Sequence, residues 1–194
     1  MPSRLWKVQT DEKKLYLTFD DGPIPGLTEW VLDLLLLKKA KATFFCVGAN
    51  IEKHADIFSR IKAEGHSIGN HSHNHLNGWE SKTQEYLDNV LACQQVIEKQ
   101  KVETRLFRPP YGRLKWQQRK VLSAFTIVMW DVLSKDYLQT LEPKDVLAES
   151  IKATEPGSII VFHDNLKAEK NLKFALPRYI DHFQQLGFEF DVLL

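Results

Sequence analysis

The sequence predicts an α/β protein with a parallel sheet, and its periodicity is the first reason. Short apolar runs rich in β-branched and aromatic residues alternate with longer amphipathic runs along the chain. Strict alternation of this kind is typical of parallel strands with helices packed outside them. No glycine-rich dinucleotide fingerprint follows the first strand, which weakens a nucleotide-binding, doubly wound sheet. Periodicity does not choose between such a sheet and a barrel. A closed barrel in 194 residues would have to be trimmed, because the eight-fold form takes about 250.

Each element is assigned from its local pattern. The segments predicted as strands are Leu15–Phe19, Ala42–Val47, Ser67–Gly69, Leu106–Phe107, Phe125–Trp130, Ser158–Phe162 and Phe188–Leu193. The segments predicted as helices are Thr28–Lys39, Ile51–Glu64, Glu80–Lys99, Lys115–Leu122, Pro143–Thr154 and Asn171–Leu186. Thr28 is expected to be the N-cap of the first helix, and Gly65 and Gly187 follow helices where a C-terminal glycine belongs. Pro143 suits the first turn of its helix, where its missing N–H costs nothing.

Composition excludes several classes of protein. With 43% hydrophobic residues and a net charge of +1, residues 1–194 are expected to form a single globular domain, monomeric by default. No charge excess favours a nucleic acid or an anionic membrane as partner. The longest apolar run, Val31–Leu37, is interrupted by Asp33 and is too short for a membrane span.

The cysteines and the N-terminal segment carry two further expectations. Cys46 and Cys93 lack CxxC spacing and are expected to be buried free thiols. Residues 1–14 are polar and contain no apolar signal-peptide core. The chain as given is therefore expected to be cytoplasmic, although a chain trimmed of its leader would look the same.

Polar residues follow the predicted strands. The segments at the strand ends are Asp20-Asp21-Gly22-Pro23, His71-Ser72-His73-Asn74-His75, Arg108-Pro109-Pro110-Tyr111-Gly112, Trp130-Asp131 with Asp136-Tyr137 five residues on, and His163-Asp164. In barrels and open α/β sheets alike, the carboxyl ends of the strands build the active site. We therefore expect one crevice to collect all of these segments.

His71 and His75 are candidate metal ligands because they are four residues apart. In a helical turn this spacing places two imidazoles on one face, close enough to share a metal ion. A pair with this spacing is also common on protein surfaces, so a carboxylate from another strand end is needed to complete a site. Two histidines and one aspartate leave positions open for water and substrate, as in catalytic rather than structural sites. His73 is expected to point elsewhere.

Asp20 and Asp21 are adjacent, so at an extended strand end they are expected to point in opposite directions. One carboxylate could then bind a metal ion while the other faces the water that the ion holds. The alternative is an Asp-Asp-Gly turn that merely ends the strand. This adjacent pair is unsuited to a glycosidase, whose two carboxylates must flank the scissile bond about 5–9.5 Å apart.

The later segments offer a cation that can hold a carboxylate, a backbone donor for an oxyanion and a side chain that can donate a proton. The proline-rich turn can present Arg108 to a carboxylate and aim the backbone N–H of Tyr111 at an oxyanion. The alternative is a stiff loop with an exposed arginine. His163 ends an apolar strand and is either a core histidine or a general acid. Asp136 is a candidate to orient and charge it.

Taken together, these motifs resemble the polysaccharide deacetylases of carbohydrate esterase family 4, the NodB-homology domain. The matching segments, in order, are Thr18-Phe19-Asp20-Asp21, His71 to His75, Arg108-Pro109-Pro110-Tyr111, Asp136-Tyr137 and Val161-Phe162-His163. Order, spacing and strand context agree over roughly residues 15–193. The first three motifs are specific in combination, and the last two are weaker.

The resemblance implies a trimmed (β/α)7 barrel, TIM-like, that binds one divalent metal ion. The ion is expected to be zinc, with cobalt or nickel as alternatives. By position in the motifs, the implied ligands are Asp21, His71 and His75.

The resemblance also implies a catalytic role for each remaining motif residue. Asp20 would be the general base and Arg108 would hold it. The Tyr111 backbone N–H would stabilise the oxyanion. His163 would protonate the leaving amine, with Asp136 tuning its acidity.

The fourth motif departs from the family pattern. Where many members have Asp-x-x-Asp-Trp, this chain has Leu133-Ser134-Lys135-Asp136-Tyr137. The expected aromatic wall of the acetyl pocket is therefore Tyr137, and Val161 stands where a leucine usually lines it.

The function that the resemblance implies is N-deacetylation of GlcNAc-containing glycans of the chitin-oligosaccharide or peptidoglycan type. An O-acetyl esterase of the acetylxylan type is the first alternative, because it would use the same site. A catalytically weak carbohydrate-binding protein is the second, and retention of both base and acid argues against it.

Overall fold

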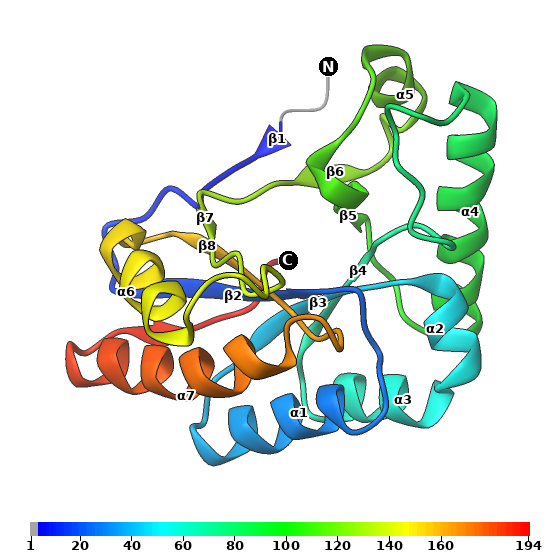
Figure 1. The fold of residues 1–194 in the computed structure, drawn as a ribbon. Helices are drawn as coiled ribbons and strands as arrows, with labels where there is room; N and C mark the ends of the chain where they lie inside the picture. The colour runs from blue at the N-terminus through cyan, green and yellow to red at the C-terminus, as the bar shows by residue number, and fades with distance from the viewer. Residues whose placement is uncertain (1–3) are drawn as a thin grey trace.

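The structure, a computed structural model, describes residues 4–194 and shows a parallel sheet curved into an incomplete barrel, with helices arranged outside it (Figure 1). The strands are β1 (Arg4–Leu5), β2 (Lys14–Asp20), β3 (Ala42–Cys46), β4 (Ser67–Asn70), β5 (Leu106–Phe107), β6 (Thr126–Val128), β7 (Val132–Leu133), β8 (Ile159–His163) and β9 (Glu189–Phe190). The helices are α1 (Leu27–Leu37), α2 (Gly48–Lys53), α3 (Ala55–Ala63), α4 (Thr83–Lys99), α5 (Trp116–Val121), α6 (Pro143–Ala153) and α7 (Glu169–Gln185), with a 3₁₀ turn, η1 (Pro110–Gly112).

The strand order β1-β6-β5-β4-β3-β2-β8-β7 confirms the expected trimmed (β/α)7 barrel, with β9 added beside β2. The named strands pair in parallel throughout. Within residues 4–194 the strand path ends at β1 and β7 and no ladder joins these two strands, so the barrel is open between them. The N-terminal segment runs along this opening: β1 pairs with β6, and Lys7 then bridges to Ser158 just before β8.

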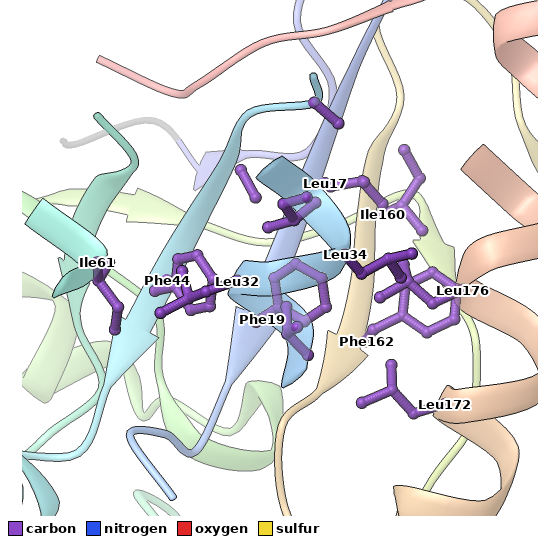
Figure 2. Packing of buried hydrophobic residues seen from close by; sticks show 14 of the residues in the cluster. Leu17, Phe19, Leu32, Leu34, Phe44, Ile61, Ile160, Phe162, Leu172 and Leu176 are labelled. Atoms are coloured by element: carbon purple, nitrogen blue, oxygen red, sulfur yellow. The ribbon is translucent and has the colours of Figure 1, made fainter. Parts of the chain in front are cut away.

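The side chains of β2 alternate between the two faces of the sheet, as strand geometry requires. Leu15, Leu17 and Phe19 belong to the large hydrophobic cluster between the sheet and the outer helices. Figure 2 shows Phe19 between Phe44 of β3 and Phe162 of β8, at ring-centroid distances of 5.1 and 6.4 Å. This packing fixes one face of each strand against the helices. The other face of β2 is thereby directed into the barrel.

Several predicted boundaries are confirmed. Gly65 and Gly187 follow α3 and α7 with φ of 74° and 80°, the left-handed conformation that favours glycine after a helix. Pro143 is the first residue of α6. Cys46 and Cys93 are both buried and free. No helix in the described part of the chain is long and apolar enough to cross a membrane.

Other local predictions are wrong. Thr28 is not an N-cap: α1 begins at Leu27 after Gly26, whose N–H donates to Glu29 Oε2 at 2.7 Å. The helix expected over 51–64 is two helices that meet at His54, where φ is −134° and ψ is 52°. The strand expected over 125–130 covers only 126–128.

The remaining differences are in length and in the number of strands. The last strand shortens from the expected 188–193 to Glu189–Phe190, and α4 begins at Thr83 rather than at residue 80. The two-residue strands β1 and β7 were not expected.

Candidate metal centre and active site

Arg108 crosses the interior of the barrel and holds Asp20 there. Its side chain is fully buried, and Nη1 donates to Asp20 Oδ1 at 2.7 Å and to Thr18 Oγ1 at 2.6 Å. Nη2 donates to the Met129 carbonyl at 2.9 Å, and the guanidinium lies 4.1 Å from the centroid of the Phe45 ring. A buried cation requires partners of this kind. Burial lowers the pKa of Arg108, and the Asp20 carboxylate beside it opposes that change.

Asp21, His71 and His75 converge on one point. Asp21 Oδ1 lies 3.0 Å from His75 Nε2 and 3.5 Å from His71 Nε2, and the three ligand atoms all lie within 4.8 Å of one another. This oxygen is buried, and no described residue makes a hydrogen bond of normal geometry to it. Burial alone would raise the pKa of Asp21, but the two histidine rings hold it well below its usual value. The cluster therefore presents an ionised oxygen and two imidazole nitrogens to one volume.

The backbone achieves this convergence in a way that the sequence did not predict. His71 and His75 do not lie on a helical turn; they belong to an irregular loop after β4, in which Ser72 and His75 have φ of 61° and 54°. Asp20 and Asp21 do not point apart, because Asp21 has φ of 87°. This left-handed residue turns the chain at the strand end. Both carboxylates consequently lie within 4 Å of His71 Nε2.

Neighbouring groups set the orientation of the cluster. His71 Nδ1 donates to the Arg108 carbonyl at 2.8 Å, because a carbonyl oxygen can only accept. The other ring nitrogen, Nε2, is then the one left with a free lone pair. Asn165 Nδ2 donates to Asp21 Oδ2 at 2.5 Å, and Asn50 Nδ2 donates to the Asp21 carbonyl at 2.8 Å.

His163 and Asp136 form a second charged pair. His163 Nδ1 lies 2.7 Å from Asp136 Oδ1, and the His163 N–H donates to Asp136 Oδ2 at 2.8 Å. Burial by itself lowers the pKa of His163, but the fully buried Asp136 carboxylate outweighs it and the pKa rises to about 9. The imidazole is therefore charged at neutral pH and can donate a proton from Nε2.

The pairing of β2 with β8 places these two groups side by side. Asp20 and His163 are partners in the parallel ladder, each at the carboxyl end of its strand. Both side chains face the inside of the barrel. Arg108 holds Asp20, and Asp136 holds His163. They line a cavity of about 840 Å³ together with Asp21, His71 and His75. A proton acceptor and a proton donor thus face the volume that the cluster occupies.

Aromatic and apolar side chains form the walls of this cavity. Tyr137 packs edge-on against the His163 ring at a centroid distance of 4.9 Å, and Val161 of β8 also lines the cavity. The exposed Tyr111 ring packs against His75 at 4.7 Å. Tyr111 itself is left-handed, with φ of 60°, within the turn η1. Every residue singled out from the sequence as catalytic, metal-binding or substrate-binding therefore lies in or beside this cavity.

Two strand-end acids lie outside the cavity. Asp131 accepts from Ile159 N–H at 2.7 Å and from Ser158 Oγ at 2.8 Å, so it fixes the start of β8. Asp164 is fully buried and accepts from Gly22 N–H at 3.0 Å and from Thr28 Oγ1 at 2.5 Å. Burial raises the pKa of Asp164 to about 7.

Asn50 and Asn165 were missed by sequence reasoning. Both hydrogen-bond Asp21, but an asparagine in a loop is most often a turn residue. The only available signal for Asn165 was its position two residues after His163.

Comparison with known proteins gives consistent matches. Residues 7–130 match the family model described as polysaccharide deacetylase. The chain is 31% identical over 189 residues to a peptidoglycan-N-acetylglucosamine deacetylase of Bacillus cereus, covering 95% of this chain and 88% of that protein. It is 30% identical over 162 residues to a chitooligosaccharide deacetylase of Azorhizobium caulinodans, covering 81% and 77%. Among solved structures, the Bc1960 peptidoglycan N-acetylglucosamine deacetylase superposes with a TM-score of 0.92 at 29% identity, covering 98% of this chain and 90% of that one.

Proposed function

Because this chain belongs to the polysaccharide deacetylase family, we propose that it hydrolyses the N-acetyl group of GlcNAc units in a glycan of the chitin-oligosaccharide or peptidoglycan type. The observation that carries the proposal is the pairing of Asp20 with His163 across β2 and β8, directly beside the Asp21, His71 and His75 cluster. An acid and a base in this arrangement can serve the two proton transfers of amide hydrolysis.

The cluster fits a divalent metal ion, and we propose zinc. Asp21 Oδ1 is ionised and buried, it accepts no hydrogen bond of normal geometry within residues 4–194, and two imidazole nitrogens lie close to it. Such an oxygen would be costly to bury unless a cation completed its surroundings. Two histidines and one carboxylate suit zinc, and cobalt or nickel can use the same set. When bound, the ion would activate a water molecule and polarise the acetyl carbonyl oxygen.

Asp20 is the proposed general base. Its Oδ1 accepts from Arg108, while Oδ2 lies 3.9 Å from His71 Nε2 and so faces the cluster. The hydrogen bond from Arg108 fixes the rotation of this carboxylate. Asp20 therefore takes the proton from the attacking water, whose oxygen forms a bond with the acetyl carbon.

The tetrahedral intermediate places negative charge on the former carbonyl oxygen. Pro109 and Pro110 have no N–H, so Tyr111 supplies the first backbone donor of this turn, and we assign it to the oxyanion. Tyr137 and Val161 form the proposed pocket for the acetyl methyl group.

Collapse of the intermediate breaks the carbon–nitrogen bond. His163 donates its Nε2 proton to the departing nitrogen, which leaves as the free amine of the sugar, and acetate is the other product. Asp136 keeps His163 charged before this step and holds its ring in place afterwards.

A side-by-side assay of N-acetyl and O-acetyl substrates tests the proposal. Chitin oligosaccharides and acetylated xylan would be compared with metal-loaded protein, measuring acetate release. We expect a higher kcat/KM for the chitin oligosaccharides, because the paired acid His163 assists a poor amine leaving group. Preference for acetylated xylan would replace the proposal with the O-acetyl esterase. Glycan binding without acetate release from either would favour a carbohydrate-binding protein.

A further inference from the structure

Trp79 is exposed on the loop that follows the metal-cluster residue His75. Its side chain is 59% exposed, and the Arg113 guanidinium lies over its ring at 4.9 Å. The loop, residues 76–82, joins His75 to α4. A large aromatic ring left in water beside a cavity is a common mark of a binding surface.

The loop is held rigidly rather than left free. The buried Gln118 of α5 donates from Nε2 to the Gly78 carbonyl at 2.7 Å, and Lys115 Nζ donates to the Ser81 carbonyl at 2.8 Å. The Trp79 N–H donates to Asn77 Oδ1 at 3.1 Å. Gly78 packs so closely on the Arg113 carbonyl that a Cβ would not fit. The exposure of Trp79 is therefore built into the loop.

The Trp79 surface is continuous with the catalytic cavity. Tyr111 and Arg113 both line the cavity, and Tyr111 packs against His75 at 4.7 Å. Arg113 then reaches from the cavity rim to the Trp79 ring. A row of flat side chains thus leads outward from the candidate metal ligands: Tyr111, then Arg113, then Trp79. We call this row the aromatic strip.

We propose that the outer part of the aromatic strip, Trp79 with Arg113, binds a second sugar ring of the glycan chain whose acetylated unit occupies the cavity. The inference rests on the proposed function, because it takes the occupant of the cavity to be one unit of a glycan. A pyranose ring has a flat face of C–H groups, which packs on an aromatic ring, and a rim of hydroxyl groups, which accept from a guanidinium. The strip offers these two chemistries next to each other, in a preorganised loop.

The substrate predicted by this site is a chain of sugars rather than a monosaccharide. A single acetylated sugar would fill the cavity without reaching Trp79. A longer oligosaccharide would gain contact area on the strip and bind more tightly. The extra contacts should lower KM rather than raise kcat, because no atom of Trp79 or Arg113 is assigned a role in the proton transfers.

The test compares Trp79→Ala with Trp79→Phe, using chitopentaose and a small aryl acetate that is too short to reach Trp79. We expect KM for the pentamer to rise roughly two- to tenfold in Trp79→Ala, with kcat nearly constant, and to recover in Trp79→Phe. The rise in KM for the pentamer is expected to exceed any change in KM for the aryl acetate, because the aryl acetate tests the cavity alone. Trp6→Ala is the matched control: Trp6 is 47% exposed and lies in the N-terminal segment.

Calorimetric binding of chitopentaose separates this inference from the proposed function. If Trp79→Ala binds the pentamer more weakly but the unaltered protein releases no acetate, the sugar-binding role of Trp79 stands and the proposed function is overturned. Equal affinity of Trp79→Ala and the unaltered protein for the pentamer would overturn the proposed role of Trp79 in binding a second sugar ring, whatever the turnover. An equal loss on pentamer and aryl acetate would also overturn it, because the effect would then arise in the cavity.

Discussion

Asn165 binds one oxygen of Asp21 and leaves the other for the histidines. The Asn165 amide donates to Asp21 Oδ2 at 2.5 Å, while Oδ1 lies between the Nε2 atoms of His71 and His75. The amide of Asn165 is itself fixed, since its Oδ1 accepts from the Ala168 N–H at 3.1 Å. The carboxylate can therefore offer only Oδ1 to the cluster, and its rotation is set from the end of β8.

Asn165→Ala is expected to weaken metal binding by roughly 10- to 100-fold, the usual effect of losing a group that orients a ligand. Competition between the protein and a chelator for Zn²⁺ or Co²⁺ measures this affinity directly, without turnover. Lys170→Ala is the control, because Lys170 is an exposed residue at the start of α7 that does not line the cavity. Equal affinity in the two variants would show that Asn165 does not position Asp21.

Asp20→Asn and His75→Ala are expected to fail in different ways. Asparagine can still accept from Arg108 but cannot take a proton, so turnover should fall by at least about 10²–10⁴-fold while the metal stays bound. His75→Ala removes one of the three proposed ligands, so the metal itself should be lost. Metal content and acetate release, measured on the same preparations, separate the two effects. Equal metal loss in both variants would contradict this division of roles.

Asp136→Asn is expected to shift the pH profile. The Asp136 carboxylate stabilises charged His163 against the effect of burial and raises its pKa to about 9, so the acid form persists into the alkaline range. Removing that charge lowers the pKa of His163. The alkaline limb of kcat/KM should therefore move to lower pH, because this profile reports the groups of the free enzyme. An alkaline limb that stays in place would mean that another group controls it.

The fold was largely predictable because its strands are buried on both faces. Segments such as Ile159–Phe162 are continuous apolar runs, which parallel sheets require, and glycines mark the ends of α3 and α7. The break at His54 was not predictable, because neither proline nor glycine lies there and the apolar spacing continues into Ile57 and Phe58.

The sequence predicted that the site residues would lie around one cavity, but it did not predict how they are arranged there. Strand-end position identified Asp20, Asp21 and His163, since parallel strands bring their carboxyl ends together. The left-handed backbone at Asp21, which turns both carboxylates toward one histidine, leaves no mark in composition or spacing. Asn165 was missed for a similar reason, because its partner is 144 residues away in the sequence.

Acetate release from chitin oligosaccharides, measured on protein stripped with a chelator and then given Zn²⁺ or Co²⁺, tests the central claim most directly. The arrangement of Asp20, His163 and the Asp21, His71 and His75 cluster predicts no release from the stripped protein and restored release after metal addition. Stoichiometric metal binding without acetate release would indicate that the site acts on a different acetylated substrate. Failure to bind any divalent metal would contradict the account.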